Sequence, residues 1–207
     1  LVEWCDSNYL ELNVTKTKEL VVDFRRTGSC VDPIVIKGEP VEQVDHYKYL
    51  GTLIDNRLDW SPNVDAVCKK ANQRLFFLRK LKQFKVAPNI LQLFFQATIQ
   101  SVLTFNQLCY VGNTKKADME RLEKVVSRAA SIIGDELVPL ATLYRSVALT
   151  KLQKMRADAS HPLHQTLASC EPTRECSRRL RCLKARTNRL RDSFLPTAIR
   201  LYNETLG

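Results

Sequence analysis

The chain has 207 residues, of which 44% are hydrophobic, as expected for one ordinary globular domain or two small ones. No run approaches the roughly 18 apolar residues of a membrane-spanning helix, and no secretion signal opens the chain, so we expect an intracellular protein, nuclear or cytoplasmic, without membrane contact. The net charge of +10 is unevenly distributed. Residues 1–60 hold seven Lys and Arg and eleven Asp and Glu, whereas residues 61–207 hold 25 Lys and Arg and 11 Asp and Glu. This asymmetry favours a polyanionic partner for the second part of the chain.

Residues 1–59 are predicted to form a small α+β domain. Residues 1–12 place Leu1, Trp4 and Cys5 on one helical face, and turn-forming residues then break this pattern. Three later stretches alternate in the manner of strands, and the last of them has Gly51 at a bulge or a close approach. These stretches are residues 19–24, 33–38 and 41–55.

The apolar period changes at residue 60, where a helical domain that reaches residue 159 is predicted. Ser61 and Pro62 supply a cap and a first-turn proline for a helix that runs to Phe84. Its apolar residues recur every three or four positions, so we expect them to form a buried stripe. They are Val64, Val67, Ala71, Leu75, Leu78 and Leu81.

Further helices complete this domain and lead into a tail. A helix that opens at Pro88 is apolar almost all round, so it should be central and buried. Residues 114–133 carry an apolar stripe that stops at Gly134, and residues 139–158 form one or two more helices. Residues 160–207 are predicted to be a basic tail, arginine-rich and loop-like at first, with a final amphipathic helix.

The seven cysteines are odd in number and mostly scattered, which predicts reduced thiols rather than a disulfide framework. They are Cys5, Cys30, Cys68, Cys109, Cys170, Cys176 and Cys182. A zinc site would combine His161 and His164 with the last three cysteines, but the five-residue gaps between these cysteines do not match structural zinc sites. We therefore expect no metal, and His161 is predicted to be a turn or cap residue.

Several strings, taken in order along the whole chain, resemble one family. The chain opens with LVEWCDSNYLELNVTKTKELVVDFRR and continues with HYKYLGTLID and the basic string QRLFFLRKLKQF; LTFNQLCYVG, SHPLH and SFLPTAIRLYN follow. This series is similar to the C-terminal part of the reverse transcriptase of a LINE-type, non-LTR retrotransposon. The resemblance implies an α+β palm remnant, with a helix and short antiparallel strands, followed by a mostly α-helical, thumb-like bundle.

The resemblance also implies roles for residues of the first domain. Lys16, or else Lys18, would be the cation for departing pyrophosphate, but only if a complete palm were present. A primer-grip-like hairpin would contain Tyr47, Tyr49, Leu50 and Gly51. From the residues alone, Lys16 is instead a solvated lysine, and the hairpin residues are sheet core with Gly51 at a bulge.

Polymerases of this kind hold two metal ions through palm aspartates. The family places the Asp-Asp turn of this site upstream of the helix with which the present sequence opens. The sequence itself contains no Asp-Asp pair. We therefore expect a fragment that is not an enzyme, needs no cofactor and takes no small-molecule substrate.

Two clusters of basic residues predict contact with the phosphate backbone of RNA or DNA, with little sequence preference. No Asp or Glu interrupts residues 69–85, where the candidate binding residues are Lys69, Lys70, Arg74, Arg79, Lys80 and Lys82. In the second cluster, within residues 174–191, they are Arg178, Arg179 and Arg181. A solvated helix face is the alternative for the first cluster, and the second is predicted to be disordered without nucleic acid.

Two other interpretations remain open. Residues 1–26 are also similar to the N-terminal segment named after the AlkB homologue that modifies transfer RNA, which would point to an iron- and 2-oxoglutarate-dependent oxidoreductase or a tRNA methyltransferase. That chemistry needs a His-x-Asp iron motif or a methyl-donor glycine loop, and the sequence holds neither. The remaining interpretation is a helical protein-interaction module of retroelement origin.

Overall fold

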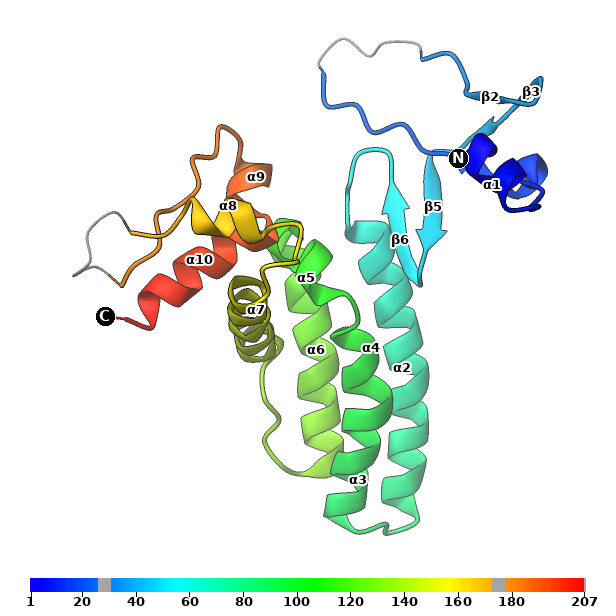
Figure 1. The fold of residues 1–207 in the computed structure, drawn as a ribbon. Coiled ribbons are helices and arrows are strands. Elements are labelled where there is room, and N and C mark those ends of the chain that lie inside the picture. The colour runs from blue at the N-terminus through cyan, green and yellow to red at the C-terminus, as the bar shows by residue number, and fades with distance from the viewer. Residues whose placement is uncertain (26–30, 173–177, 207) are drawn as a thin grey trace. The chain divides into compact units, whose positions relative to one another are not determined.

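The computed structural model describes residues 1–25, 31–172 and 178–206, and the chain divides into two compact units (Figure 1). Unit 1 is Leu1–Asn63, with a short helix and short strands, and unit 2 is Val64–Gly207, which is mostly helical. The predicted fold class, an α+β part followed by a mostly helical part, is confirmed. No helix in the described ranges is both long and apolar enough to cross a membrane.

The described strands of unit 1 form three separate two-stranded sheets. Two of these are antiparallel, as predicted, and the third is parallel. The parallel pair is β1 (Lys18–Glu19) with β4 (Glu42–Gln43); the antiparallel pairs are β2 (Val35–Ile36) with β3 (Glu39–Pro40), and β5 (His46–Tyr49) with β6 (Thr52–Asp55).

The predicted strands at residues 19–24 and 33–38 were too long, since β1 and β2 have two residues each. A strand persists only where a neighbouring backbone pairs with its N–H and C=O groups, and β3 and β4 are themselves two residues long. The helix predicted over residues 1–12 is also shorter, because α1 spans only Val2–Ser7. Of its expected apolar face only Cys5 is buried.

The β5–β6 hairpin closes through a two-residue loop. Tyr49 pairs with Thr52, and the intervening Leu50 and Gly51 both have positive φ, of 45° and 88°. Two successive positive φ values define the type I′ turn, whose twist matches that of the flanking strands. Gly51 is therefore a turn residue, and its predicted place at a bulge was wrong.

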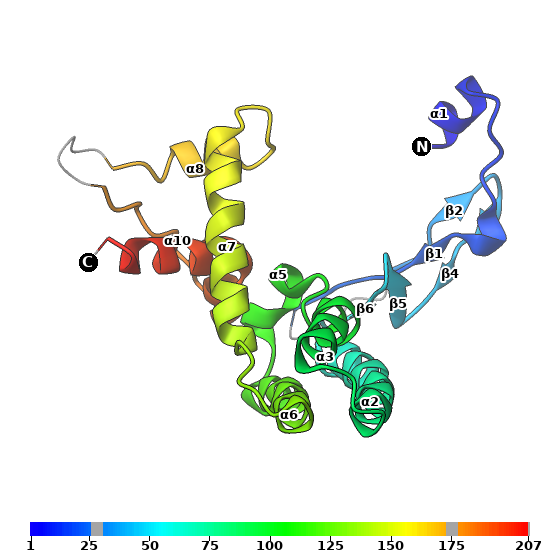
Figure 2. The ribbon, with the colours of Figure 1, turned by 90° about the horizontal axis from the view of Figure 1, so that it is seen from below.

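Unit 2 contains three long helices and a continuous helix in three parts. Figures 1 and 2 both show α2, α3 and α6 running alongside one another. The elements are α2 (Ser61–Gln83, which starts within unit 1), α3 (Pro88–Phe94), η2 (Phe95–Gln100), α4 (Ser101–Leu103), α5 (Gln107–Tyr110), η3 (Val111–Asn113), α6 (Lys116–Ile133), α7 (Leu140–Ala157), α8 (His164–Ala168), α9 (Asn188–Asp192) and α10 (Phe194–Glu204); unit 1 adds η1 (Val14–Lys16). The helix starts at Ser61 and Pro88 and the stop at Gly134, with φ of 85°, match the predictions.

The helix formed by α3, η2 and α4 is buried along one side only. Its buried residues are Leu91, Phe95, Ile99 and Leu103, whereas Ile90 and Leu93 are exposed, so the prediction of burial all round was wrong. The stripe repeats every four residues, and such positions drift around an α-helix of 3.6 residues per turn. The η2 segment is a π-helix, and its wider turn brings positions four apart closer to one face.

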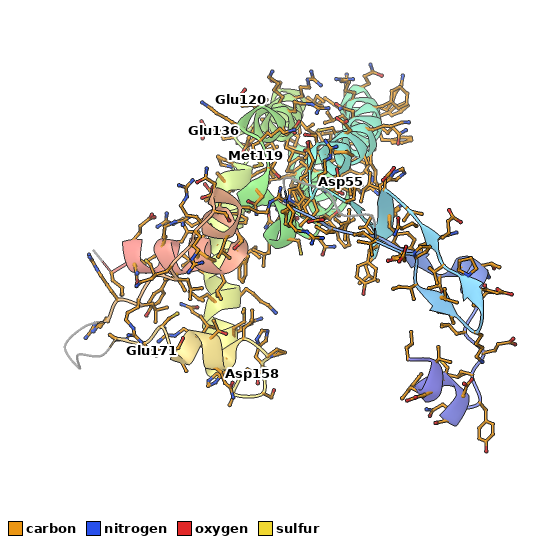
Figure 3. All side chains as sticks on the ribbon, turned by 90° about the horizontal axis from the view of Figure 1, so that it is seen from above. Asp55, Met119, Glu120, Glu136, Asp158 and Glu171 are labelled. Carbon is orange, nitrogen blue, oxygen red and sulfur yellow. The ribbon has the colours of Figure 1, made fainter. Side chains whose placement is uncertain are left out.

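Helices α8 and α10 share a buried core with α7. Eight buried residues form it: Ala148, Leu152, Met155, Leu167, Cys170, Leu180, Ala198 and Ile199. Around it, the Arg156 guanidinium lies over the Tyr202 ring at 5.2 Å and pairs at 2.7 Å with Glu171, which Figure 3 labels. The final amphipathic helix, α10, is thereby packed against α7 through its apolar face.

Candidate nucleic-acid interface

Helix α2 packs an apolar stripe against the other helices of unit 2 and exposes a basic surface to solvent. Val64, Ala71, Leu75 and Leu78 are buried as predicted, whereas Val67 and Leu81 are only half-buried. A stripe at this spacing leaves the other residues of α2 off the core. Lys69, Lys70, Arg79 and Lys80 are all exposed, and we call these four residues the basic face.

Along the chain, the acidic residues nearest to the basic face are Asp65 and Asp118. No Asp or Glu occurs between Asp65 and Asp118, a stretch that includes nearly all of α2 and the whole of the helix from Pro88 to Leu103. Both bounding carboxylates pair with Arg121 of α6, at 2.5 Å to Asp65 and 2.9 Å to Asp118. Within the described ranges, no carboxylate forms an ion pair with the basic face.

Two other predicted cations of α2 have structural partners. The Arg74 guanidinium donates a hydrogen bond to the carbonyl of Thr98, within the π-helical segment. Lys82 Nζ donates to the carbonyl of Ile133 at 2.9 Å, at the C-terminal end of α6 where a cation is favourable. These two side chains join α2 to neighbouring helices, so they are less available to a ligand than the basic face.

Exposed phenylalanines lie among the cations of α2, and they were not predicted to be part of the site. Phe76, Phe77 and Phe84 have exposed fractions of 52%, 56% and 78%. Phe76 and Phe77 meet edge to face, and Lys80 Nζ lies 5.7 Å from the centre of the Phe76 ring. The sequence did hold a signal for their exposure, because these phenylalanines lie off the apolar stripe of α2, whereas a phenylalanine of the core would lie on that stripe.

The second basic cluster is only partly described. Arg178 and Arg179 are exposed and directly precede the buried Leu180, whose backbone N–H donates to Asn203 Oδ1 at 2.8 Å. The Arg181 guanidinium donates to the carbonyl of Ser169. Leu180 thus fixes this segment to α10, and the prediction of disorder does not hold for these three arginines; Arg174 lies outside the described residues.

The predicted sites of unit 1 are dispersed over its surface. Lys16 is exposed at the end of η1, and Lys18 forms an ion pair with Glu42 of β4. On the hairpin, Tyr47, Tyr49 and Leu50 are exposed, so their alternative assignment to a sheet core was wrong. The two-stranded sheet has too little opposing surface to cover these side chains.

The histidines and cysteines that were considered for zinc do not converge. Within the described residues, no three His, Cys, Asp or Glu side chains are placed to hold a metal ion; Cys30 and Cys176 lie outside them. The His161 ring accepts a hydrogen bond from the Leu163 N–H at 3.1 Å through Nδ1, as predicted for a turn residue. Cys5, Cys68 and Cys170 are buried free thiols, whereas Cys109 and Cys182 are exposed.

Sequence comparison gives two partial matches. The family described as "Alkylated DNA repair protein alkB homolog 8, N-terminal" matches residues 60–101, from the start of α2 to the start of α4. This confirms the second predicted resemblance as to family, but the match lies at residues 60–101 and not at residues 1–26. No solved structure matches the chain.

The other match is to a transposon protein. The chain is 31% identical over 81 residues to the "Probable RNA-directed DNA polymerase from transposon BS" of Drosophila melanogaster. These residues make up 39% of this chain, and the match spans only 9% of the length of that relative. The predicted resemblance to the reverse transcriptase of a retroelement is thereby confirmed for this part of the chain.

Proposed function

We propose that the chain is a retroelement-derived, non-catalytic fragment that binds the phosphate backbone of RNA or DNA through the basic face of α2. The observation that carries the proposal is the set of four exposed cations, without ion-pair partners in the described ranges, in a stretch that contains no Asp or Glu. Solvated helix faces commonly mix both signs of charge, and an uncompensated one favours a polyanionic ligand. The likeness to an RNA-directed DNA polymerase supports the same ligand class.

The absence of an Asp-Asp pair from the sequence supports the non-catalytic part of the proposal. Two-metal phosphoryl transfer requires carboxylates that neutralise the attacking and leaving oxygens. Oxidation or methyl transfer of the kind that the AlkB-related name suggests is not proposed, because the sequence has no His-x-Asp iron motif and no methyl-donor glycine loop.

The test is the salt dependence of duplex DNA binding by the wild type and by a variant with Lys69, Lys70, Arg79 and Lys80 all replaced by glutamine. Each phosphate contact adds roughly 0.9 to the slope of log affinity against log salt, so the variant should lose about three to four units of slope. All DNA sequences should be weakened about equally, because contacts to the backbone do not distinguish bases.

The matched control removes the same number of charges elsewhere, by replacing the exposed Lys116, Lys124, Lys151 and Lys154 of α6 and α7 with glutamine. This control should keep most of the wild-type slope, and circular dichroism should show both variants to be as helical as the wild type. Equal loss of slope in both variants would indicate a general charge effect, and the proposal would then be wrong.

A further inference from the structure

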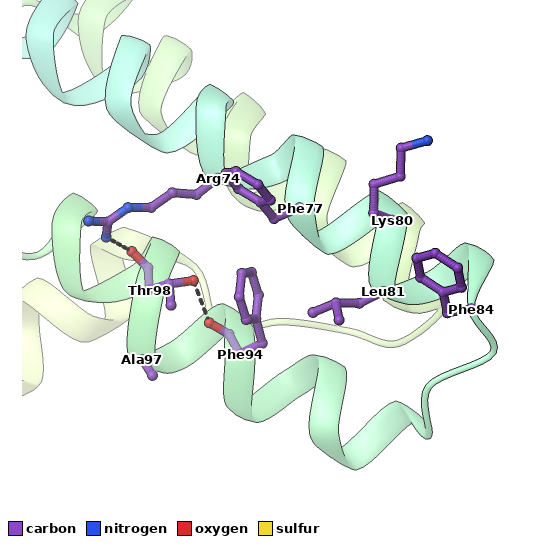
Figure 4. Close-up of a pocket in the computed structure, with 8 residues that line it drawn as sticks. All are labelled: Arg74, Phe77, Lys80, Leu81, Phe84, Phe94, Ala97 and Thr98. Atoms are coloured by element: carbon purple, nitrogen blue, oxygen red, sulfur yellow. Dashed lines mark hydrogen bonds between the residues drawn. The ribbon is translucent and has the colours of Figure 1, made fainter.

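A groove runs between α2 and the helix that follows it, next to the basic face. Its volume is about 540 Å³, within the range of about 300–1,000 Å³ that small ligands occupy in proteins. Figure 4 shows Leu81 and Phe94 pointing toward one another from the two helices, while Lys80 extends away from them. The lining residues are Arg74, Phe77, Lys80, Leu81, Phe84, Phe94, Ala97 and Thr98.

One hydrogen bond within the second helix and one between the two helices fix the polar end of the groove. Thr98 donates its hydroxyl to the carbonyl of Phe94 at 2.6 Å, and its own carbonyl accepts the Arg74 guanidinium (Figure 4). Thr98 belongs to the π-helical segment η2, where the wider turn alters the direction of the backbone groups. At one end of the groove lies the guanidinium of Arg74, which the Thr98 carbonyl holds in place. Aromatic rings line the rest of the groove.

The chemistry of the groove restricts its occupant. Phe77 and Phe84 are exposed aromatic rings, which offer flat apolar surfaces, and among the described residues that line the groove only Lys80 and Arg74 are charged. An occupant should thus combine a planar apolar group with negative charge. Nucleotides have both features in one repeating unit, and proteins that bind single strands commonly pair aromatic rings with a basic surface.

We propose that this groove takes an unpaired nucleobase of a single-stranded segment, stacked on Phe77 or Phe84, while the adjoining phosphates lie on Lys80 and the rest of the basic face. This inference rests on the proposed function and adds to it a preference for single strands or frayed ends. In a duplex both faces of each base are covered by neighbouring bases, so a base reaches the groove only where it is unpaired.

The experiment compares three DNA probes of equal length, namely a single strand, its duplex and a strand of abasic sites, by fluorescence anisotropy. The variant F77L/F84L keeps apolar surface in the groove but removes both ring faces. Base–aromatic stacking is lost in this variant, so its affinity for the single strand should fall roughly tenfold. Its affinity for the duplex and the abasic strand should stay near that of the wild type.

The matched control is F105L, because Phe105 is a half-exposed phenylalanine that does not line the groove. This variant should bind all three probes as the wild type does. Since Phe77 and Phe84 are exposed, the double variant should also keep the wild-type unfolding midpoint.

The outcomes separate this inference from the proposed function. If F77L/F84L binds the single strand as tightly as the wild type, or if the abasic strand binds as tightly as the one with bases, the nucleobase site is wrong while backbone binding still stands. The groove would then suit an apolar segment of an acidic protein partner. If the wild type binds none of the three probes, the proposed function itself is wrong.

Discussion

The two units differ in how much of their apolar surface they bury. In unit 1, Trp4, Ile34 and Tyr49 are more than half exposed, and its strands pair over only two to four residues. In unit 2, Leu75, Ile99 and Leu152 are almost completely buried on helices of different parts of the chain. Helices satisfy their own backbone hydrogen bonds, whereas strands depend on partners, so a helical unit reaches a closed core with fewer residues.

Hydrogen exchange should show the largest difference between the units. Local opening ranges from almost no free-energy cost at loosely packed segments up to the full cost of unfolding in a core. Amides of residues 19–25 and 31–55 should therefore exchange orders of magnitude faster than those of residues 88–133. Comparable protection in both ranges would contradict the view that unit 1 is the less stable one.

A leucine truncation tests whether unit 2 depends on its buried stripes. Leu152 is fully buried in the core between α7 and α10, so Leu152→Ala should lower the free energy of unfolding by about 2–5 kcal/mol. Leu93→Ala is the control, because Leu93 is 60% exposed on α3, and it should change this free energy by less than about 0.5 kcal/mol. Urea denaturation followed by circular dichroism measures both, and equal effects would argue against a fixed core.

A buried tyrosine should make unit 2 sensitive to alkaline pH. Burial, and to a lesser extent the nearby Cys68 and Cys109, raises the pKa of Tyr110 from 10.0 to about 12. The folded state thus holds the proton more tightly than the unfolded state, so this stabilisation is complete below pH 10 and is lost as the pH rises toward 12. The loss should be about 2 kcal/mol.

The variant Tyr110→Phe isolates this contribution from the other groups that titrate above pH 10. It removes the ionisable hydroxyl, and with it the hydrogen bond to the Leu103 carbonyl at 3.2 Å. Unfolding midpoints measured from pH 9 to 12 should decline less steeply in this variant than in the wild type. Parallel curves would show that Tyr110 titrates alike in the folded and unfolded states.

The sequence predicted the helices of unit 2 better than the strands of unit 1. Ser61, Pro88 and Gly134 mark ends of helices in both the prediction and the structure, because caps and breakers act on the backbone within a few residues. The strand ladders depend on distant partners, so a correct alternation at residues 19–24 still led to a strand of two residues. The π-helical segment had only one signal, the four-residue spacing of its buried stripe.

The candidate site was predictable in its residues but not in their partners. The basic residues of α2 could be read directly from the sequence. Two of them, Arg74 and Lys82, nevertheless donate hydrogen bonds to carbonyls that lie 24 and 51 residues further along the chain. Contacts over such distances follow from the packing of helices, which periodicity alone does not specify. The groove beside Phe77 and Phe84 likewise exists only once α3 lies next to α2.

The packing of α10 on α7 has a consequence for how the chain is synthesised. Ala198 and Ile199 of α10 belong to the same buried core as the apolar residues of α7, so this core cannot close until α10 has been synthesised. Synthesis adds roughly 5–20 residues per second, so α7 emerges several seconds before its partner. During that interval the core around Ala148, Leu152 and Met155 is incomplete on the nascent chain, and incompletely covered apolar surface of this kind is prone to association.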